Sequence, residues 1–228
     1  MTKTRGVFLC IEGGDGSGKS TQYDLLAAHF EKEGQQLLRV NFPQYGQPSA
    51  ELVELYLRNE FGDATKLDPR LASLPYAIDR LAATPSIVEA LAAGNTVLAG
   101  RFTASNMAYQ GAKLTDRRVR IQFFKWLESL EGDIMRIPQP DRYFILHVPA
   151  DIALRRVQQR DDGSPTGKKI DGHEVDLAYQ TRAEQTYLDL VEAFPSRFEL
   201  IECVNGTYEK TPAEIHEEIW RRVKELIS

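Results

Sequence analysis

The feature that most constrains this chain is a glycine-rich segment at residues 13–21. It reads Gly-Gly-Asp-Gly-Ser-Gly-Lys-Ser-Thr and matches the pattern G-x-x-x-x-G-K-[ST] in full. A short apolar run precedes it and a segment of helical character follows. Glycines let the backbone N–H groups curl inward to form an anion-binding nest, and the positive end of the following helix points to the same place. The sequence therefore predicts a site for the phosphates of a nucleoside triphosphate.

Individual positions of this loop have separate chemical roles. Lys19 supplies a point charge for the outer phosphates, and the Ser20 hydroxyl can complete the ligand shell of a Mg²⁺ ion. We expect the whole loop to bind the triphosphate, through Gly13, Gly14, Asp15, Gly16, Ser17, Gly18, Lys19, Ser20 and Thr21.

Short runs rich in Val, Ile, Leu and Phe recur along the chain and alternate with longer helical patterns. Most runs are continuously apolar, which is typical of parallel strands covered on both faces. The predicted strands are residues 7–11, 37–42, 96–99, 143–148 and 198–204. The clearest helices are residues 19–33, 49–60, 69–93, 115–131 and a last one with Thr211 as its cap and Pro212 and Glu214 in its first turn. The pattern predicts an α/β fold in one domain over residues 1–228, a three-layer P-loop fold with a five-stranded parallel sheet flanked by helices.

The charge balance limits the kind of partner. Lys plus Arg number 28 and Asp plus Glu number 33, which gives a formal net charge of −5. Proteins that bind nucleic acid polymers usually carry net positive charge, so such a partner is not expected.

The sequence also indicates the compartment. The apolar runs are far shorter than the ~20 residues that cross a bilayer. Residues 1–6 have no signal-peptide hydrophobic segment behind their charges. Cys10 and Cys203 lie in apolar runs and read as buried free thiols. We expect a cytoplasmic protein that binds small-molecule nucleotides, and neither a nucleic acid polymer nor a membrane.

The surroundings of the loop indicate the type of reaction. No acidic residue follows the runs 96–99 and 143–148, and no Asn-Lys-x-Asp segment is present to read guanine, which disfavours a GTPase switch or a helicase-like motor. Residues 161–173 have almost no apolar side chains and predict an exposed, mobile lid. Arginines and lysines stand in separate contexts at Arg80, Arg101, Arg155, Arg156, Arg160, Lys168 and Lys169. Phosphoryl transfer depends on positioning and charge neutralisation, so the loop, these cations and the lid together predict a small kinase. The alternative for any one of these cations is that it is a solvated surface charge.

Four segments carry a resemblance to a known family. They are FLCIEGGDGSGKSTQ at residues 8–22, Asn-Phe-Pro at 41–43, LPYAIDR at 74–80 and GRFTASNMAYQGAK at 100–113. Their order and spacing resemble those of the thymidylate kinases, a family of nucleoside monophosphate kinases, along essentially the whole chain. The resemblance implies ATP-dependent phosphorylation of dTMP to dTDP, with ATP and Mg²⁺ as cofactors and a homodimer as the assembly.

The resemblance also implies roles in the acceptor pocket. Tyr76 would stack on the thymine ring, Gln110 would read the pyrimidine edge, Tyr109 would lie against the sugar and Arg101 would hold the acceptor phosphate. Arg80 and Ser105 would hydrogen-bond the base or its neighbours. The implied pocket residues are Phe42, Tyr76, Arg80, Arg101, Ser105, Tyr109 and Gln110.

Four residues are implied for the transfer step, namely Lys19, Asp15, Arg101 and Arg160. Asp15 would approach the acceptor nucleotide, and Arg160 or the lysine pair at 168–169 would bring charge to the transferring group when the lid closes. Arg156 would lie over the donor adenine.

Three positions differ from the family's pattern. Gly100 stands where the family usually has the aspartate of Asp-Arg-Tyr, and Tyr45 stands where an arginine often clamps the acceptor phosphate. Gly16 stands where some members carry an arginine, so we expect the lid to supply the catalytic charge. These differences motivate two alternatives: a related deoxynucleotide or nucleoside kinase with a different acceptor, and a non-catalytic nucleotide-binding paralogue.

Overall fold

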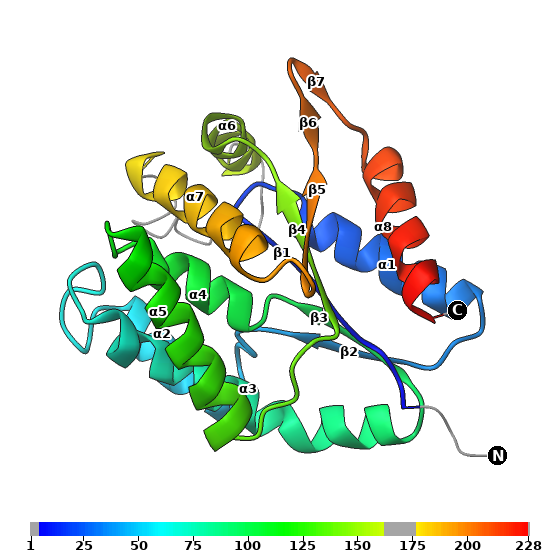
Figure 1. The fold of residues 1–228 in the computed structure, drawn as a ribbon, viewed down its shortest axis with the longest axis horizontal. Coiled ribbons are helices and arrows are strands. Elements are labelled where there is room, and N and C mark those ends of the chain that lie inside the picture. Colours follow the sequence, from blue (N-terminus) through cyan, green and yellow to red (C-terminus); the bar gives the residue numbers. More distant parts are fainter. Residues whose placement is uncertain (1–4, 162–176, 228) are drawn as a thin grey trace.

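The computed structural model describes residues 5–161 and 177–227 (Figure 1). A five-stranded parallel sheet lies at its centre, in the order β2-β3-β1-β4-β5. The strands are β1 (Phe8–Gly13), β2 (Leu37–Asn41), β3 (Thr96–Gly100), β4 (Arg142–His147) and β5 (Phe198–Glu202). The five predicted strands and their parallel arrangement are confirmed. The last predicted strand is shorter than expected because Val204 belongs to a separate hairpin of β6 (Val204–Asn205) and β7 (Tyr208–Glu209).

Alternate residues of β1 face two different layers of helices. Phe8 and Cys10 belong to one core cluster, and Leu9 and Ile11 belong to the other. The first cluster is covered by α3 (Pro69–Ala92), α4 (Thr103–Gly111), α5 (Arg117–Glu128) and α7 (Leu177–Ala193), the second by α1 (Lys19–Lys32), α8 (Pro212–Ile227) and part of α6 (Ala150–Asp161) (Figure 1). Helices thus cover both faces of the sheet, which explains why most of its strands are continuously apolar.

Side-chain caps set several helix boundaries. Asp68 accepts a hydrogen bond from the backbone N–H of Arg70 at 2.8 Å, where α3 begins. Asp116 caps α5 in the same way. At α8 the Glu214 carboxylate accepts from the Thr211 N–H at 2.7 Å, and the Thr211 hydroxyl accepts from the Glu214 N–H at 3.3 Å. This reciprocal pair confirms the predicted cap of the last helix.

Other helices differ from the prediction. Residues 49–60 form a short 3₁₀ turn (Pro48–Ala50) and α2 (Glu51–Leu57), and the helix predicted to reach residue 131 ends at Glu128. A π-helical turn follows (Ser129–Ile134), and its wider spacing directs Glu131 into the core. The helices α4, α6 and α7 are not among those predicted individually. α4 gives little periodic signal because polar residues such as Asn106 and Gln110 are buried along with its apolar ones.

The register of the sheet brings the candidate site residues together. Asn41 at the end of β2 pairs with Gly100 of β3, which pairs with Ile11 of β1. The loop after β1, Phe42 after β2 and Arg101 after β3 therefore meet at one edge of the sheet. The predicted lid at 161–173 lies, apart from Asp161, outside the described residues.

Two smaller predictions can also be compared with the structure. Cys10 and Cys203 are buried and unpaired, as predicted. Among the helices of residues 5–161 and 177–227, none has the length and apolar character needed to cross a membrane.

Candidate active site

The glycine-rich loop joins β1 to α1. Gly16 and Gly18 have left-handed φ angles of 78° and 91°, which turn the chain so that α1 begins at Lys19. Lys19 Nζ donates to the Gly14 carbonyl at 2.5 Å. The Ser17 hydroxyl is buried and has no hydrogen-bond partner among the described residues. A helix start beside an unsatisfied buried hydroxyl is a ready site for an anion.

Gly16 has a steric reason for being glycine. A Cβ atom at this position would lie 2.3 Å from the Ala153 carbonyl oxygen, because α6 packs directly on the loop. An arginine cannot extend from this position without moving α6. The packing of α6 on the loop therefore explains why this chain has a glycine where some family members have an arginine.

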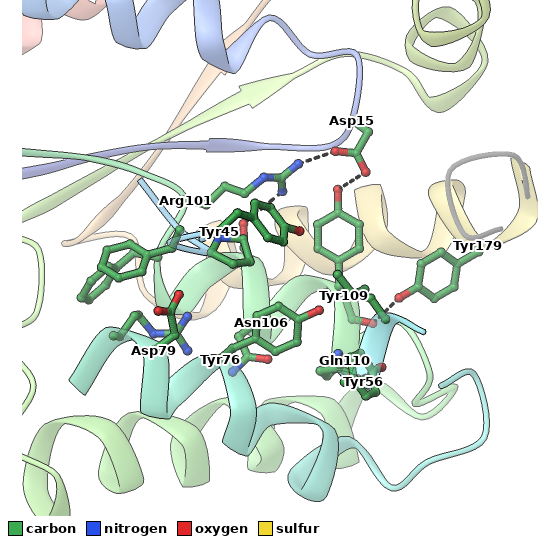
Figure 2. A pocket seen from close by; sticks show the side chains of 16 residues that line it. Asp15, Tyr45, Tyr56, Tyr76, Asp79, Arg101, Asn106, Tyr109, Gln110 and Tyr179 are labelled. Atoms are coloured by element: carbon green, nitrogen blue, oxygen red, sulfur yellow. Dashed lines mark hydrogen bonds and ion pairs between the residues drawn. The ribbon is translucent and has the colours of Figure 1, made fainter. Parts of the chain in front are cut away.

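Asp15 connects the loop to Arg101, just before α4, and to Tyr109 within α4 (Figure 2). Its carboxylate accepts hydrogen bonds from the Arg101 guanidinium and, at 2.7 Å, from the Tyr109 hydroxyl, and it lies 3.8 Å from Lys19 Nζ. Burial raises the pKa of Asp15, but the positive charges of Arg101 and Lys19 outweigh it and hold the pKa well below its ordinary value. Asp15 is thus a carboxylate at every physiological pH.

Glu12 is a site residue that the sequence did not reveal. It is fully buried in β1, and its carboxylate accepts from the Phe102 N–H at 2.6 Å, the Ser105 hydroxyl at 2.6 Å and the Tyr187 hydroxyl at 3.0 Å. These bonds fix the first turn of α4 to the strand that carries the loop. Arg101 has a left-handed φ of 62° at this junction, so Glu12 supports the backbone that directs Arg101.

A pocket opens beside this junction, between the carboxyl edge of the sheet, α3 and α4 (Figure 2). All seven residues predicted for the acceptor pocket line it, together with Asp15. Tyr45, the residue found where an arginine often clamps the acceptor phosphate, also lines it. The lining further includes residues without a role predicted from the sequence: Pro43, Tyr56, Leu57, Asp79, Phe102, Asn106 and Tyr179.

Aromatic and amide groups form the end of the pocket farther from the loop. The Tyr76 ring lies edge to face with the Tyr56 ring, with centroids 5.9 Å apart. Asn106 Nδ2 donates to the Ser73 carbonyl at 3.1 Å, and a carbonyl only accepts, so the amide orientation is fixed. Asn106 Oδ1 is then left as a buried acceptor with no partner in the described part of the chain. Such an atom calls for a donor from a ligand.

Arg80 reaches the pocket from a buried ion pair. Its Nε and Nη2 atoms donate to the two carboxylate oxygens of Glu131 at 2.8 and 2.6 Å, and Arg80 is only 2% exposed. The Thr103 hydroxyl donates to the same carboxylate at 2.6 Å. The π-helical turn that carries Glu131 thus fixes the plane of this guanidinium. Sequence patterns alone do not reveal this pair, because Glu131 is simply the last residue of the helix predicted over residues 115–131.

The surroundings of the other two departures from the family pattern, Gly100 and Tyr45, are also defined. A Cβ atom at Gly100 would lie 2.7 Å from Asn41 Oδ1, so the Asn41 amide fills the space where a side chain at position 100 would begin. After Phe42, the Gln44 N–H and the Ser49 hydroxyl donate to the buried carboxylate of Asp79, at 2.8 and 2.6 Å. Tyr45 stands at the pocket with more than half of its surface exposed.

The remaining predicted cations lie on α6. Arg156 Nη1 donates to the Gly16 carbonyl at 3.3 Å and its Nη2 donates to Glu209 at 2.6 Å, so Arg156 lies beside the loop. Arg155 instead forms an exposed pair with Asp151 at 3.6 Å, away from the pocket lining. Arg160 is in the last turn of α6, but its side chain is outside the described part, as are Lys168 and Lys169.

A parallel sheet that carries a P-loop at its carboxyl edge, and a second pocket lined by an aspartate of that loop, define a P-loop nucleotide kinase. Residues 11–218 match the family model of thymidylate kinase. The chain therefore belongs to the thymidylate kinase family, whose reaction is the ATP-dependent phosphorylation of dTMP to dTDP.

Individual relatives agree with this assignment. The chain is 31% identical over 185 residues to a thymidylate kinase of Mycobacterium tuberculosis, covering 81% of this chain and 85% of the relative. It is 30% identical over 226 residues to a probable thymidylate kinase of Thermococcus gammatolerans, covering 97% and 98%. The solved thymidylate kinase of Candida albicans has a similar fold, with a TM-score of 0.70 and 23% identity over 97% of this chain and 92% of that one.

Proposed function

We propose that this chain carries out the family's reaction with dTMP in the pocket of Figure 2 and ATP on the P-loop. The observation that carries the proposal is the contact of Asp15 with Arg101 and Tyr109. A residue of the triphosphate loop forms one end of the pocket, so an acceptor phosphate held at that end lies next to the donor. Such proximity supplies much of the rate in phosphoryl transfer.

The far end of the pocket suits a thymine ring. Thymine has one donor on its pairing edge, N3–H, between two carbonyl acceptors. Asn106 Oδ1 supplies the matching buried acceptor, while Arg80 and Gln110 supply donors. Tyr76 offers a stacking face, which is worth about 1–3 kcal/mol for a base on an aromatic ring. Phe42 supports the same wall from the strand side.

The near end of the pocket suits the sugar and the phosphate. Arg101 binds the acceptor phosphate, and Ser105, which accepts from Arg101 Nη1 at 3.3 Å, helps to hold the guanidinium in place. Tyr109 lies against the sugar, between Asp15 and the base end. The acceptor oxygen is already ionised at neutral pH, because the second pKa of a phosphate monoester is about 6. No general base is therefore needed.

The donor site consists of the loop from Gly13 to Thr21 and the cations around it. Lys19 and the inward N–H groups bind the outer phosphates, and Arg160 brings charge to the transferring group from the end of α6. Arg156, beside Gly16, lies over the adenine. The proposed lid, residues 161–173, continues from α6.

The residues present fit a Mg²⁺ ion bound mainly through the nucleotide. No group of three His, Cys, Asp or Glu side chains suited to a metal occurs among residues 5–161 and 177–227. Mg²⁺ at phosphate sites needs only one or two protein oxygens, the rest being phosphate and water. Ser20, exposed at the first turn of α1, would supply such an oxygen. When bound, Mg²⁺ neutralises charge on the phosphates.

The acceptor assignment is tested by steady-state kinetics with dTMP, dUMP, dCMP and thymidine. We expect the highest kcat/KM with dTMP and a strong bias against dCMP, whose N3 is an acceptor and would face Asn106 Oδ1. Asn106→Ala should raise the KM for dTMP about tenfold, since it removes a buried hydrogen bond, and should leave the KM for ATP unchanged.

Lys19→Ala is the control, since it should abolish turnover with every acceptor. A preference for another acceptor would establish the related-kinase alternative. Tight ATP binding without transfer to any acceptor would establish the non-catalytic alternative.

We also propose that the chain forms a homodimer through α3. Five exposed apolar residues follow one face of this helix, Leu71, Ile78, Leu81, Pro85 and Val88, with Leu74 partly exposed between them. The six positions repeat at intervals of three and four residues, the spacing of a helix-to-helix seam. A second copy offers the same seam, so the two α3 helices can cover each other about a twofold axis.

The compartment is proposed to be the cytoplasm. The support is the state of Cys10 and Cys203, both buried thiols without a disulfide, which is usual in reducing compartments.

A further inference from the structure

Lys113 lies immediately behind the pocket and is not part of its lining. It follows α4, and its ammonium donates to the Ala64 carbonyl at 2.6 Å, the Tyr56 hydroxyl at 3.1 Å and the Leu67 carbonyl at 3.3 Å. An ammonium has three N–H donors, so these three acceptors use all of them. The side chain therefore joins α4 to α2 and to the 58–68 connection.

Tyr56 connects this ammonium to the pocket. Its hydroxyl lies 3.2 Å from the Ala64 carbonyl, to which it donates, and it accepts from Gln110 Nε2 at 3.3 Å as well as from Lys113. Its ring supports Tyr76 edge to face. Tyr56, Tyr76 and Gln110 all line the pocket. A displacement of Tyr56 would therefore move both the stacking ring and the amide at the base end.

The 58–68 connection has hydrogen bonds of its own. Asn59 Oδ1 accepts from the Ala64 N–H at 2.8 Å, and Asp63 Oδ1 accepts from the Thr65 N–H at 3.0 Å. Its shape does not depend on Lys113 alone. What Lys113 adds is the position of this segment, and of Tyr56, relative to α4.

We propose that Lys113 is a positioning residue for the base end of the acceptor pocket. By holding the Tyr56 hydroxyl it fixes the Gln110 amide and supports the Tyr76 ring, and it thereby sets the affinity for the pyrimidine nucleotide without touching it. The inference rests on the proposed function only for the identity of the acceptor.

The charge of Lys113 gives a second way to observe this role. Burial lowers the pKa of the ammonium to about 8, although Asp63 and Asp68 act in the opposite direction. The other titratable or charged groups nearby are Tyr56 from α2 and Arg182 from α7, whose Nε donates to the Ala112 carbonyl. Above pH 8 the neutral amine has one donor fewer, so one of the three bonds is lost.

The experiment compares Lys113→Met with Lys66→Met. Lys66 is on the same connection, but its side chain is 83% exposed, and its ammonium forms an ion pair with Asp63 at 3.2 Å. We expect Lys113→Met to raise the KM for dTMP about fivefold, with kcat and the KM for ATP within about twofold, because uniform acceptor binding is lost. Lys66→Met should change none of the three. Calorimetric titration with dTMP should show the same loss of affinity.

Three further measurements separate positioning from general stability. Tyr56→Phe should weaken acceptor binding, and the double variant with Lys113→Met should be no worse than the more affected single variant, because both changes break one chain of contacts. In the wild type the KM for dTMP should rise between pH 7 and pH 9. In Lys113→Arg, which stays charged, the KM should be near the wild-type value at pH 7 and should stay flat over the same range.

An unchanged KM for dTMP in Lys113→Met, an equal rise in the KM for ATP, or fully additive effects with Tyr56→Phe would each overturn the proposal. If Lys113→Met does not fold, Tyr56→Phe and the two pH profiles decide. If the wild type turns over another acceptor instead of dTMP, the proposed function fails, and the same ratios measured with that acceptor still test Lys113.

Discussion

Gly16 is the loop residue with the least space around it. A side chain at this position would be unfavourable for two reasons. The φ of 78° is left-handed, and a Cβ atom would collide with the Ala153 carbonyl of α6. Gly46 has a similar φ of 84° but nothing within 4 Å of the position of a Cβ atom. Gly16 and Gly46 therefore form a matched pair that shares the left-handed φ and differs in the steric contact.

Gly16→Ala should lower the free energy of unfolding by about 2–4 kcal/mol, since it combines left-handed strain of about 1 kcal/mol with overpacking of about 1–3 kcal/mol. Gly46→Ala should show only the strain. Urea unfolding measures both. The KM for ATP should rise in Gly16→Ala alone, because α6 and the loop are pushed apart. Equal losses of stability in the two variants would contradict the role assigned to the Ala153 contact.

At the scale of single residues, sequence reasoning reached only part of the site. The loop and the seven predicted pocket residues could be found because their types form a recognisable pattern. Glu12, Asn106 and Glu131 could not. Glu12 lies within an apolar strand, and the significance of Asn106 depends on one oxygen being left without a partner. Glu131 reaches Arg80 only through a π-helical turn. These features arise from packing between distant segments, which a local pattern does not contain.

At the scale of elements, His147 ties the end of β4 to its neighbours. Its Nε2 lies 2.9 Å from a Glu184 oxygen on α7, and its Nδ1 lies 2.6 Å from a Glu202 oxygen on β5. The Glu184 hydrogen bond, with that of Glu202, raises the pKa of His147 to about 9, although burial opposes the rise. Because the folded-state pKa lies above the ordinary value, the contribution to stability is complete below pH 6.5 and is lost as the pH rises through about 9.

His147→Gln should therefore cost about 1–2 kcal/mol of unfolding free energy at pH 6 and much less at pH 10, since a neutral side chain makes weaker bonds to two carboxylates. Urea unfolding of the wild type and the variant at both pH values gives the two differences. A cost that stays constant across this range would contradict the raised pKa of His147.

The strands could be predicted more fully than the helices. Most buried parallel strands appear in a sequence as a continuous apolar run, and all five predicted runs form strands of the sheet. The helices α4 and α7 bury polar residues, among them Gln110, Thr186 and Asp189, so their apolar periodicity is interrupted. The end of α5 could not be predicted, because the π-helical turn replaces a regular helical turn without a change in composition.

At the scale of the whole molecule, the seam on α3 predicts the assembly. Light scattering after size exclusion should give twice the chain mass of 25.8 kDa for the wild type. The double variant Leu81→Glu with Val88→Glu should elute as a monomer, because four charges would then face one another across the twofold axis.

Ile227→Glu is the matched control, since Ile227 is similarly exposed and is the last residue of α8, which covers the face of the sheet opposite α3. It should leave the dimer intact. A monomeric wild type, or dissociation of the control to the same extent, would remove α3 as the interface.

Asn41 and Gly100 lie opposite each other in neighbouring strands, and the Asn41 amide occupies the space that a side chain at position 100 would enter. A side chain at position 100 therefore requires the exposed Asn41 amide to move aside. An aspartate could enter at position 100 only together with a smaller residue at position 41, or with an asparagine turned away from the sheet edge. Across the family, these two positions should change as a pair, and a single exchange at position 100 of this chain should be tolerated better after position 41 has been reduced.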